Sequence, residues 1–256
     1  MAGVRFERAG AIGTITIDRP ETSNSLNQEA MTAIDAALAA AQGSDLHAVF
    51  IRGGGERAFI SGGDLNELES NRGMEFARSM ALSMRATLDR IPALEMPVVA
   101  LLNGHAIGGG AEVAVACDFR VAADDVRIGF TQARLGLTPA WGGIERLTAL
   151  VGRGRALALL TTGRTLAAAQ AREWGLVEEV VPRAEFEARA ASLAAELAQV
   201  PSPVLAAIKR AVGAVQPYAS PDLARSATDE FAQAWVDPAH WEAAERMEAE
   251  RRSRTR

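Results

Sequence analysis

Several residue types are scarce in this chain, and each scarcity excludes a class of protein. The 256 residues include one cysteine, Cys117, and three histidines that are far apart in the sequence. A single cysteine cannot form a disulfide within the chain, which predicts a reducing compartment such as the cytoplasm. With so few thiols and imidazoles, no structural zinc site is expected, and we predict no metal ligands.

Long apolar runs and a surplus of positive charge are also absent. No stretch of about 18 apolar residues is free of charged residues, so no membrane-spanning helix is expected. The first ten residues lack the apolar core of a secretory signal. The formal net charge is −5, which disfavours nucleic acids and anionic membranes as partners. Hydrophobic residues make up 48% of the chain, which is typical of a globular protein.

The most informative stretch is residues 98–143. An apolar run at 98–102 predicts a buried strand, and Gly108-Gly109-Gly110 separates it from an apolar helical segment at 111–117. Glycine disfavours helix by about 1 kcal/mol relative to alanine, so this run indicates a backbone that another group approaches closely. N–H groups at the start of such a helix can stabilise a developing negative charge, as an oxyanion hole does. The plainer alternative is a tight crossover.

Glu112 lies in the first turn of this expected helix and is the one charge in an apolar run. Carboxylates are rarely buried for packing alone, which makes Glu112 a candidate catalytic group. The alternative is a first-turn residue that the helix dipole favours.

A second glycine turn, Gly62-Gly63, follows the apolar pair Phe59-Ile60. A helix is expected directly after it, over 65–90. Two such turns can each direct one N–H group at the same oxygen atom, and we expect these groups to belong to Gly63 and Gly109. Strands that alternate with helices predict an α/β fold.

The remaining pattern predicts a core followed by a helical region. From residue 184 to 249 the pattern is helical only. We therefore expect a core with the active site over 1–183. Over 184–256 we expect a helical layer that packs on the core or on another subunit and serves oligomerisation. Further strands are expected over 4–7, 11–17, 48–51, 119–122, 126–130 and 176–181, and helices over 26–41 and 165–175.

The order of these pieces resembles the crotonase superfamily, also called the enoyl-CoA hydratase/isomerase family. The matching motifs are Ala58–Leu65, Asn103–Glu112, Cys117-Asp118, Leu135–Gly143, Thr162–Arg164, Gly175–Val177 and Val181-Pro182. The resemblance implies an α/β spiral of βαβ units with a C-terminal all-helical layer. It also implies an acyl-CoA thioester substrate and a homotrimer or a hexamer of two trimers. No prosthetic group is implied, because coenzyme A is part of the substrate.

The resemblance also implies roles for individual residues. The thioester oxygen would lie between the N–H groups of Gly63 and Gly109. Coenzyme A would contact the loop before Asn24 and the second glycine turn; the residues are Thr22, Ser23, Ser61, Gly62, Asp64 and Leu65. The loop departs from the family, which often has a basic residue there, whereas Glu21, Thr22 and Ser23 are acidic or polar. The acyl group would contact Glu67, Pro139 and Trp141.

The catalytic carboxylates decide which reaction is implied. Hydratases of the family have one glutamate after the glycine turn and a second twenty residues later, and here these positions hold Glu112 and Gln132. A glutamine side chain does not exchange a proton near neutral pH, so Glu112 would be the main acid/base of a hydratase or isomerase. Trp141 within the motif Thr138–Gly143, together with the motif Cys117–Arg120, resembles the decarboxylase branch of the family. One alternative is therefore an alkylmalonyl-CoA decarboxylase such as one for ethylmalonyl-CoA. Another is a catalytically silent CoA-ester-binding protein.

Overall fold

The computed structural model describes residues 3–215 and 221–254 and contains two β-sheets. In the larger sheet all neighbouring strands run parallel except the first pair, β1 and β2, which is antiparallel. Its order is β1 (Val4–Ala9), β2 (Ile12–Ile17), β3 (Ala48–Gly53), β5 (Val98–Leu102), β7 (Phe119–Ala123) and β10 (Glu179–Val181). The smaller sheet has the order β4 (Ala58–Ile60), β6 (His105–Ile107), β8 (Arg127–Gly129) and β9 (Leu166–Ala167).

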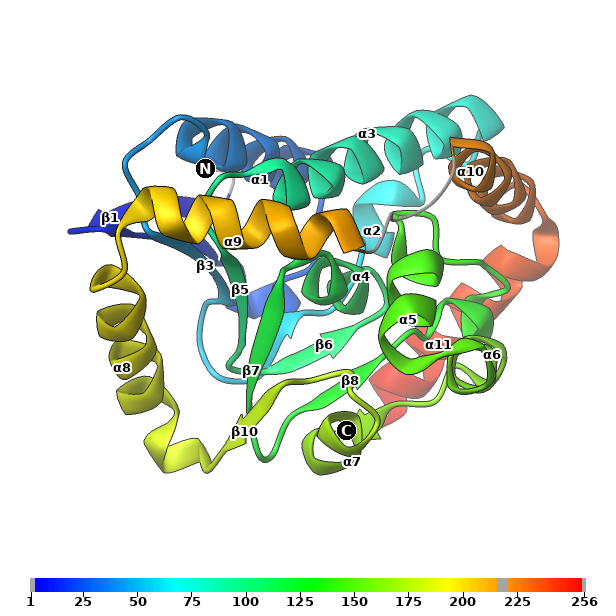
Figure 1. Cartoon of the computed structure of the whole chain (residues 1–256). Coiled ribbons are helices and arrows are strands. Elements are labelled where there is room, and N and C mark those ends of the chain that lie inside the picture. The colour runs from blue at the N-terminus through cyan, green and yellow to red at the C-terminus, as the bar shows by residue number, and fades with distance from the viewer. Residues whose placement is uncertain (1–2, 216–220, 255–256) are drawn as a thin grey trace.

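The two sheets are built by one repeated step, which confirms the predicted α/β spiral. The chain places β3 in the larger sheet and β4 in the smaller one, and it repeats this step with β5 and β6 and with β7 and β8. Helical structure follows each pair of strands. The inner strands β3, β5 and β7 of the larger sheet are almost wholly buried, because helices and the smaller sheet cover them, whereas the edge strand β1 is mostly exposed. Figure 1 shows this arrangement.

The helices surround the sheets (Figure 1). Within the core they are α1 (Gln28–Ala41), α2 (Leu65–Leu68), α3 (Met74–Ala93), α4 (Gly109–Ala116), α5 (Gly143–Val151), α6 (Arg153–Thr162) and α7 (Ala168–Glu173). The C-terminal helices are α8 (Phe186–Ala198), α9 (Ser202–Val215), α10 (Pro221–Trp235) and α11 (Pro238–Arg254). Three short 3₁₀ helices are η1 (Pro20–Thr22), η2 (Gln132–Leu135) and η3 (Arg183–Glu185).

Asn103 holds two successive steps of the spiral together. Its side-chain oxygen accepts from the Gly53 N–H at 3.0 Å, and its amide group donates to the carbonyl oxygens of Gly53 and Gly55 at 2.8 and 2.6 Å. The next residue must be small, because a Cβ atom on Gly104 would lie 2.4 Å from the Ala58 backbone. These contacts fix the start of β6 beside β4, and therefore fix the two glycine turns that follow these strands.

The predicted C-terminal helical region folds back onto the core of the same chain. Helix α10 packs along α3, and α11 packs against η2 (Figure 1). The Trp235 indole N–H donates to the Asn71 carbonyl at 3.0 Å. The buried ring of His240 packs against both Trp235 and Trp241, which also contact each other, and its Nδ1 atom lies 2.6 Å from the Leu135 oxygen.

Three predicted helix boundaries are wrong, each for a local reason. The first helix begins at Gln28 instead of residue 26, because the Asn27 side chain caps it by accepting from the Ala30 N–H at 2.9 Å. The helix expected over 65–90 is two helices, α2 and α3, with a break before Gly73. The segment expected to start a helix at residue 165 first forms β9, which pairs with β8.

Over the described parts of the chain, no single helix is long and apolar enough to cross a bilayer. Only Arg183–Ala198 and Ser202–Ala214 together meet the length and composition criteria, and they are bent by 101°. Within the same described residues, no three histidine, cysteine, aspartate or glutamate side chains are grouped closely enough to hold a metal ion.

Candidate active site

The two predicted glycine turns lie against each other. Gly62 and Gly63 follow β4, and Gly108 and Gly109 follow β6. These strands are parallel neighbours, so their carboxyl ends meet at the same edge of the smaller sheet. A Cβ atom on Gly62 would lie 3.5 Å from the Gly109 nitrogen. The fold therefore brings together the two backbone segments for which an oxyanion hole is predicted.

The N–H groups of Gly63 and Gly109 have no hydrogen-bond acceptor within the described residues. The backbone of Leu26 pairs with the turn Gly62-Gly63. Its carbonyl oxygen accepts from the Asp64 N–H at 2.9 Å and its N–H donates to the Gly62 oxygen at 2.8 Å, so the Gly63 N–H takes no part in this pairing. Gly109 is the first residue of α4, and a first-turn N–H has no acceptor within its own helix. Two donors are thus available on adjacent turns, at the positive end of α4.

Each residue of the run Gly108–Gly110 must be glycine for its own reason. Gly108 has φ of 58° and ψ of −120°, which a residue with a side chain rarely adopts. A Cβ atom on Gly109 would lie 2.2 Å from the Trp141 ring. One on Gly110 would lie 1.9 Å from the Ile60 carbonyl oxygen in β4. The run allows α4 to pack closely against β4 and against Trp141.

The Glu112 side chain is buried in α4 and accepts three hydrogen bonds. The backbone N–H groups of Trp141 and Gly143 donate to its Oε2 atom at 2.8 and 2.9 Å. The Gln132 amide donates to its Oε1 atom at 2.9 Å. Neutral donors therefore hold the carboxylate, and among the described residues no cation forms an ion pair with it.

Burial raises the pKa of Glu112 from 4.5 to about 7. The hydrogen bonds from Gly143 and Trp141 and the positive charge of Arg146 act in the opposite direction, since they favour the ionised form. Glu145 raises the pKa slightly through its negative charge. A carboxyl group with a pKa near neutrality can both take up and release a proton under ordinary conditions.

Gln132 lies at the start of η2, where it is buried beside Glu112. Its Nε2 atom donates to Glu112, but its Oε1 atom is buried without a partner. An amide can donate to a carboxylate and, after rotation, accept from a carboxylic acid. Gln132 can therefore hydrogen-bond to Glu112 in both protonation states, but it cannot itself exchange a proton.

A cavity of about 590 Å³ opens beside the turn Gly62-Gly63. Thr22, Ser61, Asp64 and Leu65, four of the residues predicted to contact coenzyme A, line it together with Gly63. The opposite wall is formed by α11, through Trp241, Ala244, Glu245, Met247, Glu248, Ala249 and Arg252. The other two predicted residues, Ser23 and Gly62, have left-handed backbone conformations and do not line this cavity.

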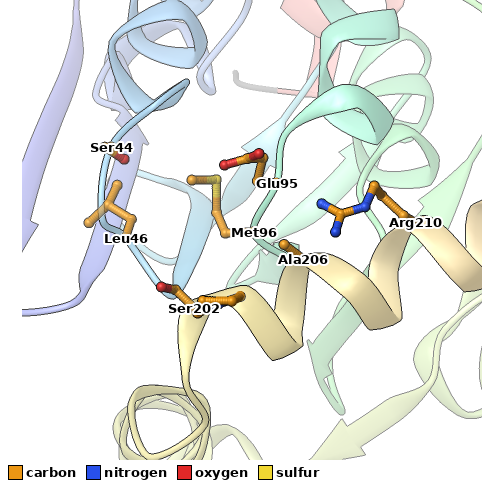
Figure 2. A pocket seen from close by; sticks show the side chains of 8 residues that line it. Ser44, Leu46, Glu95, Met96, Ser202, Ala206 and Arg210 are labelled. Carbon is orange, nitrogen blue, oxygen red and sulfur yellow. The ribbon is translucent and has the colours of Figure 1, made fainter.

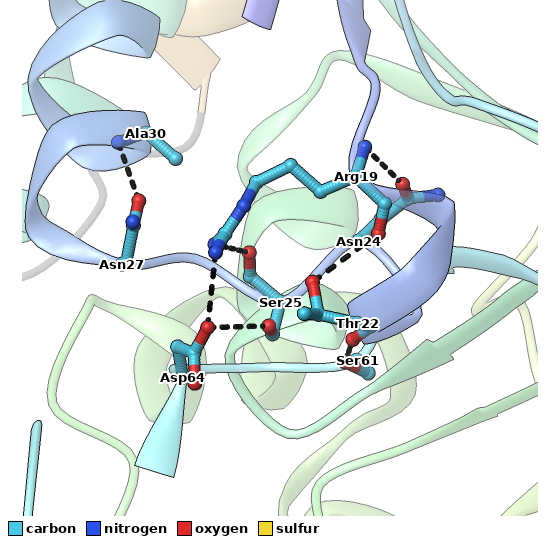
Figure 3. A network of polar contacts seen from close by, with 8 residues as sticks. All are labelled: Arg19, Thr22, Asn24, Ser25, Asn27, Ala30, Ser61 and Asp64. Atoms are coloured by element: carbon cyan, nitrogen blue, oxygen red, sulfur yellow. Dashed lines mark hydrogen bonds and ion pairs between the residues drawn. The ribbon is translucent and has the colours of Figure 1, made fainter. Parts of the chain in front are cut away.

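Hydrogen bonds fix the wall of this cavity around Asp64 (Figure 3). Arg19 and Ser25 both contact its Oδ2 atom at 3.1 Å, and the Arg19 side chain also donates to the Ser25 carbonyl. Ser61 contacts the Thr22 carbonyl at 3.5 Å. Carboxyl groups outnumber guanidinium groups in the lining of this cavity. The carboxyl groups belong to Glu21, Asp64, Glu69, Glu245 and Glu248, and the guanidinium group belongs to Arg252.

The structure places the three residues predicted near the acyl group in different surroundings. Trp141 is buried, and its ring packs against the Cα atom of Gly109. Its backbone N–H donates to Glu112. Pro139 is buried in the segment between η2 and α5. Glu67 is exposed on α2 and does not line the large cavity.

Sequence reasoning missed the backbone donors to Glu112 and the contribution of α11. The Gly142-Gly143 pair could have indicated these donors, because a further glycine turn close to a buried carboxylate can supply N–H groups. For Trp241 there was no comparable signal, because apolar periodicity in a terminal helix does not reveal which part of the core it covers.

A second cavity, of about 260 Å³, lies elsewhere and contains none of the predicted site residues (Figure 2). It is formed where the beginning of α9 meets the segments that precede β3 and β5. Its lining residues are Ser44, Leu46, Glu95, Met96, Ser202, Pro203, Ala206 and Arg210.

Known proteins are similar to this chain in both sequence and architecture. The model of the enoyl-CoA hydratase/isomerase family matches residues 7–249. A short-chain-enoyl-CoA hydratase from Clostridium acetobutylicum is 36% identical over 184 residues, which make up 72% of this chain and 70% of that protein. The crystal structure of an enoyl-CoA hydratase from Mycobacterium avium subsp. paratuberculosis aligns with a TM-score of 0.87 and 31% identity, covering 95% of this chain and 98% of that one.

The spiral of strand pairs and its two glycine turns thus define a crotonase fold. The chain belongs to the enoyl-CoA hydratase/isomerase family, as the sequence motifs indicate.

The raised pKa of Glu112 predicts a pH-dependent stability. Because the folded state binds this proton more tightly than the unfolded state, the carboxyl group destabilises the fold as the pH rises from about 4.5 through 7. The variant Glu112→Gln lacks this effect. Its free energy of unfolding should therefore rise relative to the wild type by about 2–3 kcal/mol between pH 5 and pH 8, measured by urea denaturation. A constant difference between the two proteins over this range would contradict the prediction.

The contact between Gly109 and Trp141 predicts the effect of one added methyl group. In Gly109→Ala, the new Cβ atom would overlap the buried Trp141 ring, so α4 or the ring has to move. We expect a loss of about 1–3 kcal/mol in stability, measured by urea denaturation, because overpacking a dense site strains it. Gly154→Ala is the control, since a Cβ atom there meets nothing within 4 Å. Equal stability of the two variants would contradict this contact.

Proposed function

We propose that this protein acts on acyl-CoA thioesters through an enolate, with the N–H groups of Gly63 and Gly109 as the oxyanion hole and Glu112 as the acid/base. The observation that carries the proposal is the pair of N–H groups without acceptors on adjacent turns, next to a buried carboxyl group with a pKa of about 7. The names of the related hydratases support an enoyl-CoA substrate.

The chemistry requires both features. When Glu112 takes a proton from the carbon next to the thioester, the electron pair of the C–H bond moves into the carbonyl group and leaves negative charge on its oxygen. Two fixed N–H donors stabilise that charge, and one such donor lowers a barrier by about 3 kcal/mol. With a 3-enoyl-CoA the charge extends over the adjacent double bond, and Glu112 then delivers the proton to the γ-carbon, which moves the double bond next to the thioester. The neutral Gln132 amide leaves this proton transfer to a single carboxyl group.

One carboxyl group can serve hydration as well as isomerisation. In hydration, Glu112 takes a proton from water as the oxygen attacks the β-carbon, and the same carboxyl group delivers that proton to the α-carbon. The buried Oε1 atom of Gln132 is available to accept a hydrogen bond from that water. Enoyl-CoA hydration or isomerisation with Glu112 as the main acid/base is therefore the reaction that we propose.

Decarboxylation of an alkylmalonyl-CoA is a second candidate, and one observation favours it. The position beside Glu112 holds a neutral amide instead of a second carboxylate, so the pocket carries less negative charge to repel a substrate carboxylate. In that reaction the bond to the carboxylate breaks, carbon dioxide leaves, and the electron pair forms the enolate in the same oxyanion hole.

We propose that coenzyme A binds in the cavity lined by Thr22, Ser61, Asp64 and Leu65. Its position next to Gly63 supports this proposal, because a thioester oxygen bound to the Gly63 N–H leaves the rest of the coenzyme within reach of the cavity. Its excess of carboxyl groups indicates that it takes up the uncharged part of the cofactor better than the phosphates.

Turnover of three thioesters tests the proposal. Purified protein is assayed with crotonyl-CoA, a 3-enoyl-CoA and ethylmalonyl-CoA, and we expect turnover of one of the first two. Glu112→Gln should lower kcat/KM about 100-fold or more, because general acid–base groups contribute about 10²–10⁴-fold. Turnover of ethylmalonyl-CoA alone would support decarboxylation. Tight binding of CoA esters without turnover would support a silent binding protein, and unchanged rates in Glu112→Gln would rule out its proposed role.

The exposed face of α9 supports assembly into a trimer, or a hexamer of two trimers. Val204, Ile208 and Val212 lie four residues apart on this helix and are 45%, 55% and 67% exposed. A row of exposed apolar side chains on one helix face is typical of a protein–protein contact. We propose that other copies of this chain cover it.

The oligomeric state can be measured with a matched pair of variants. Ile208→Asp places a charge in the α9 row, whereas Leu157→Asp places one at a single exposed apolar residue on α6. In sedimentation velocity the wild type and Leu157→Asp should have the mass of three or six chains of 27.0 kDa, and Ile208→Asp should shift towards the single chain. A monomeric wild type, or equal masses for both variants, would contradict the proposed contact.

A further inference from the structure

The turn Trp141–Gly143 presents two N–H groups to one oxygen atom of Glu112. These groups belong to the peptide before Trp141 and to the peptide before Gly143. The peptide between them, which joins Trp141 to Gly142, makes no contact with Glu112. Its orientation nevertheless fixes the angle between the two donors. Gly142 has φ of 92°, which allows the sharp turn that directs both N–H groups the same way.

Arg146 holds this central peptide through its carbonyl group. Its Nη1 atom donates to the Trp141 carbonyl oxygen at 2.8 Å. The guanidinium group also covers the Cα atom of Gly142, since a Cβ atom there would lie 2.2 Å from Nη1. Only 6% of the Arg146 side chain is exposed. A planar group therefore packs against the outer surface of the turn and hydrogen-bonds to it.

The guanidinium group is itself anchored on another helix. Its Nη2 atom pairs with Asp89 in α3, which also contacts Arg85 at 3.4 Å. Arg85 in turn pairs with the buried Glu145, the residue before Arg146. Two arginines and two carboxylates thus form a network between α3 and α5, which keeps Arg146 in one position.

We propose that Arg146 is a positioning residue: by holding the peptide between Trp141 and Gly142, it keeps the two flanking N–H groups directed at the Oε2 atom of Glu112. This inference rests on the proposed role of Glu112 as acid/base. Arg146 does not contact the carboxyl group, so it acts through the turn. Neither the sequence motifs nor the geometry of the glycine turns assigns this role to it.

The conservative variant Arg146→Lys tests the proposal, because it keeps the positive charge but loses the planar group that covers Gly142. With looser N–H donors, the ionised form of Glu112 loses hydrogen bonds, so its pKa should rise by about one unit. The rise is measured by infrared spectroscopy as the carboxylic acid band of Glu112, which is identified by its absence in Glu112→Gln. At high pH Glu112 is ionised in both proteins, so a difference in kcat there reports how well the carboxylate is positioned. We expect kcat at high pH to fall about tenfold in Arg146→Lys, while KM stays within about twofold.

Arg120→Lys is the matched control. Arg120 is also buried, donates to the carbonyl oxygens of Ala114 and Cys117, and pairs with the partly exposed Glu178. It does not contact the turn at Trp141. We expect Arg120→Lys to change stability but not the titration of Glu112.

A wild-type titration of Glu112 in Arg146→Lys would overturn the positioning role, and so would an equal shift in Arg120→Lys. The infrared titration needs no substrate. If no tested thioester is turned over, the proposed reaction fails, while the titration still decides whether Arg146 positions the donors to Glu112.

Discussion

A carboxyl group without solvent must obtain its hydrogen bonds from the protein, and this constraint on Glu112 shapes the centre of the molecule. Three donors from two different segments meet its two oxygen atoms: η2 contributes one, and the turn before α5 contributes two. Because an unpaired buried carboxylate would be far less stable, these segments cannot move independently of α4. The constraint therefore reaches well beyond the residue that carries the charge.

The spiral explains how distant segments reach this point. Each step places one strand in the smaller sheet, and the chain leaves that sheet at the same edge each time. The first two exits produce the glycine turns with their free N–H groups, and the third leads through η2 to the donors for Glu112. The candidate site made in this way consists largely of backbone groups, so its geometry depends on glycine conformations and on close packing more than on charged side chains.

The sequence predicted the parts of the structure that depend on local signals. The strands with long apolar runs, the two glycine turns and the buried Glu112 all belong to this class, and the proximity of the turns was inferred from their matching positions after strands. The smaller sheet was mostly missed, because strands of three residues such as β4 and β6 are too short to show periodicity. The break between α2 and α3 was also missed: Trp235 fixes it through the Asn71 carbonyl, which is a contact between residues far apart in the sequence.

Trp141 joins the two halves of the site through a single residue. Its ring excludes any side chain at position 109, while its N–H group binds the carboxylate at position 112. A change at any one of these positions therefore alters the surroundings of the other two, and their effects on stability will not be additive. We therefore expect positions 109 and 141 to vary together in evolution. A relative without the indole can accept a side chain at position 109, whereas a relative that keeps the indole must keep the glycine.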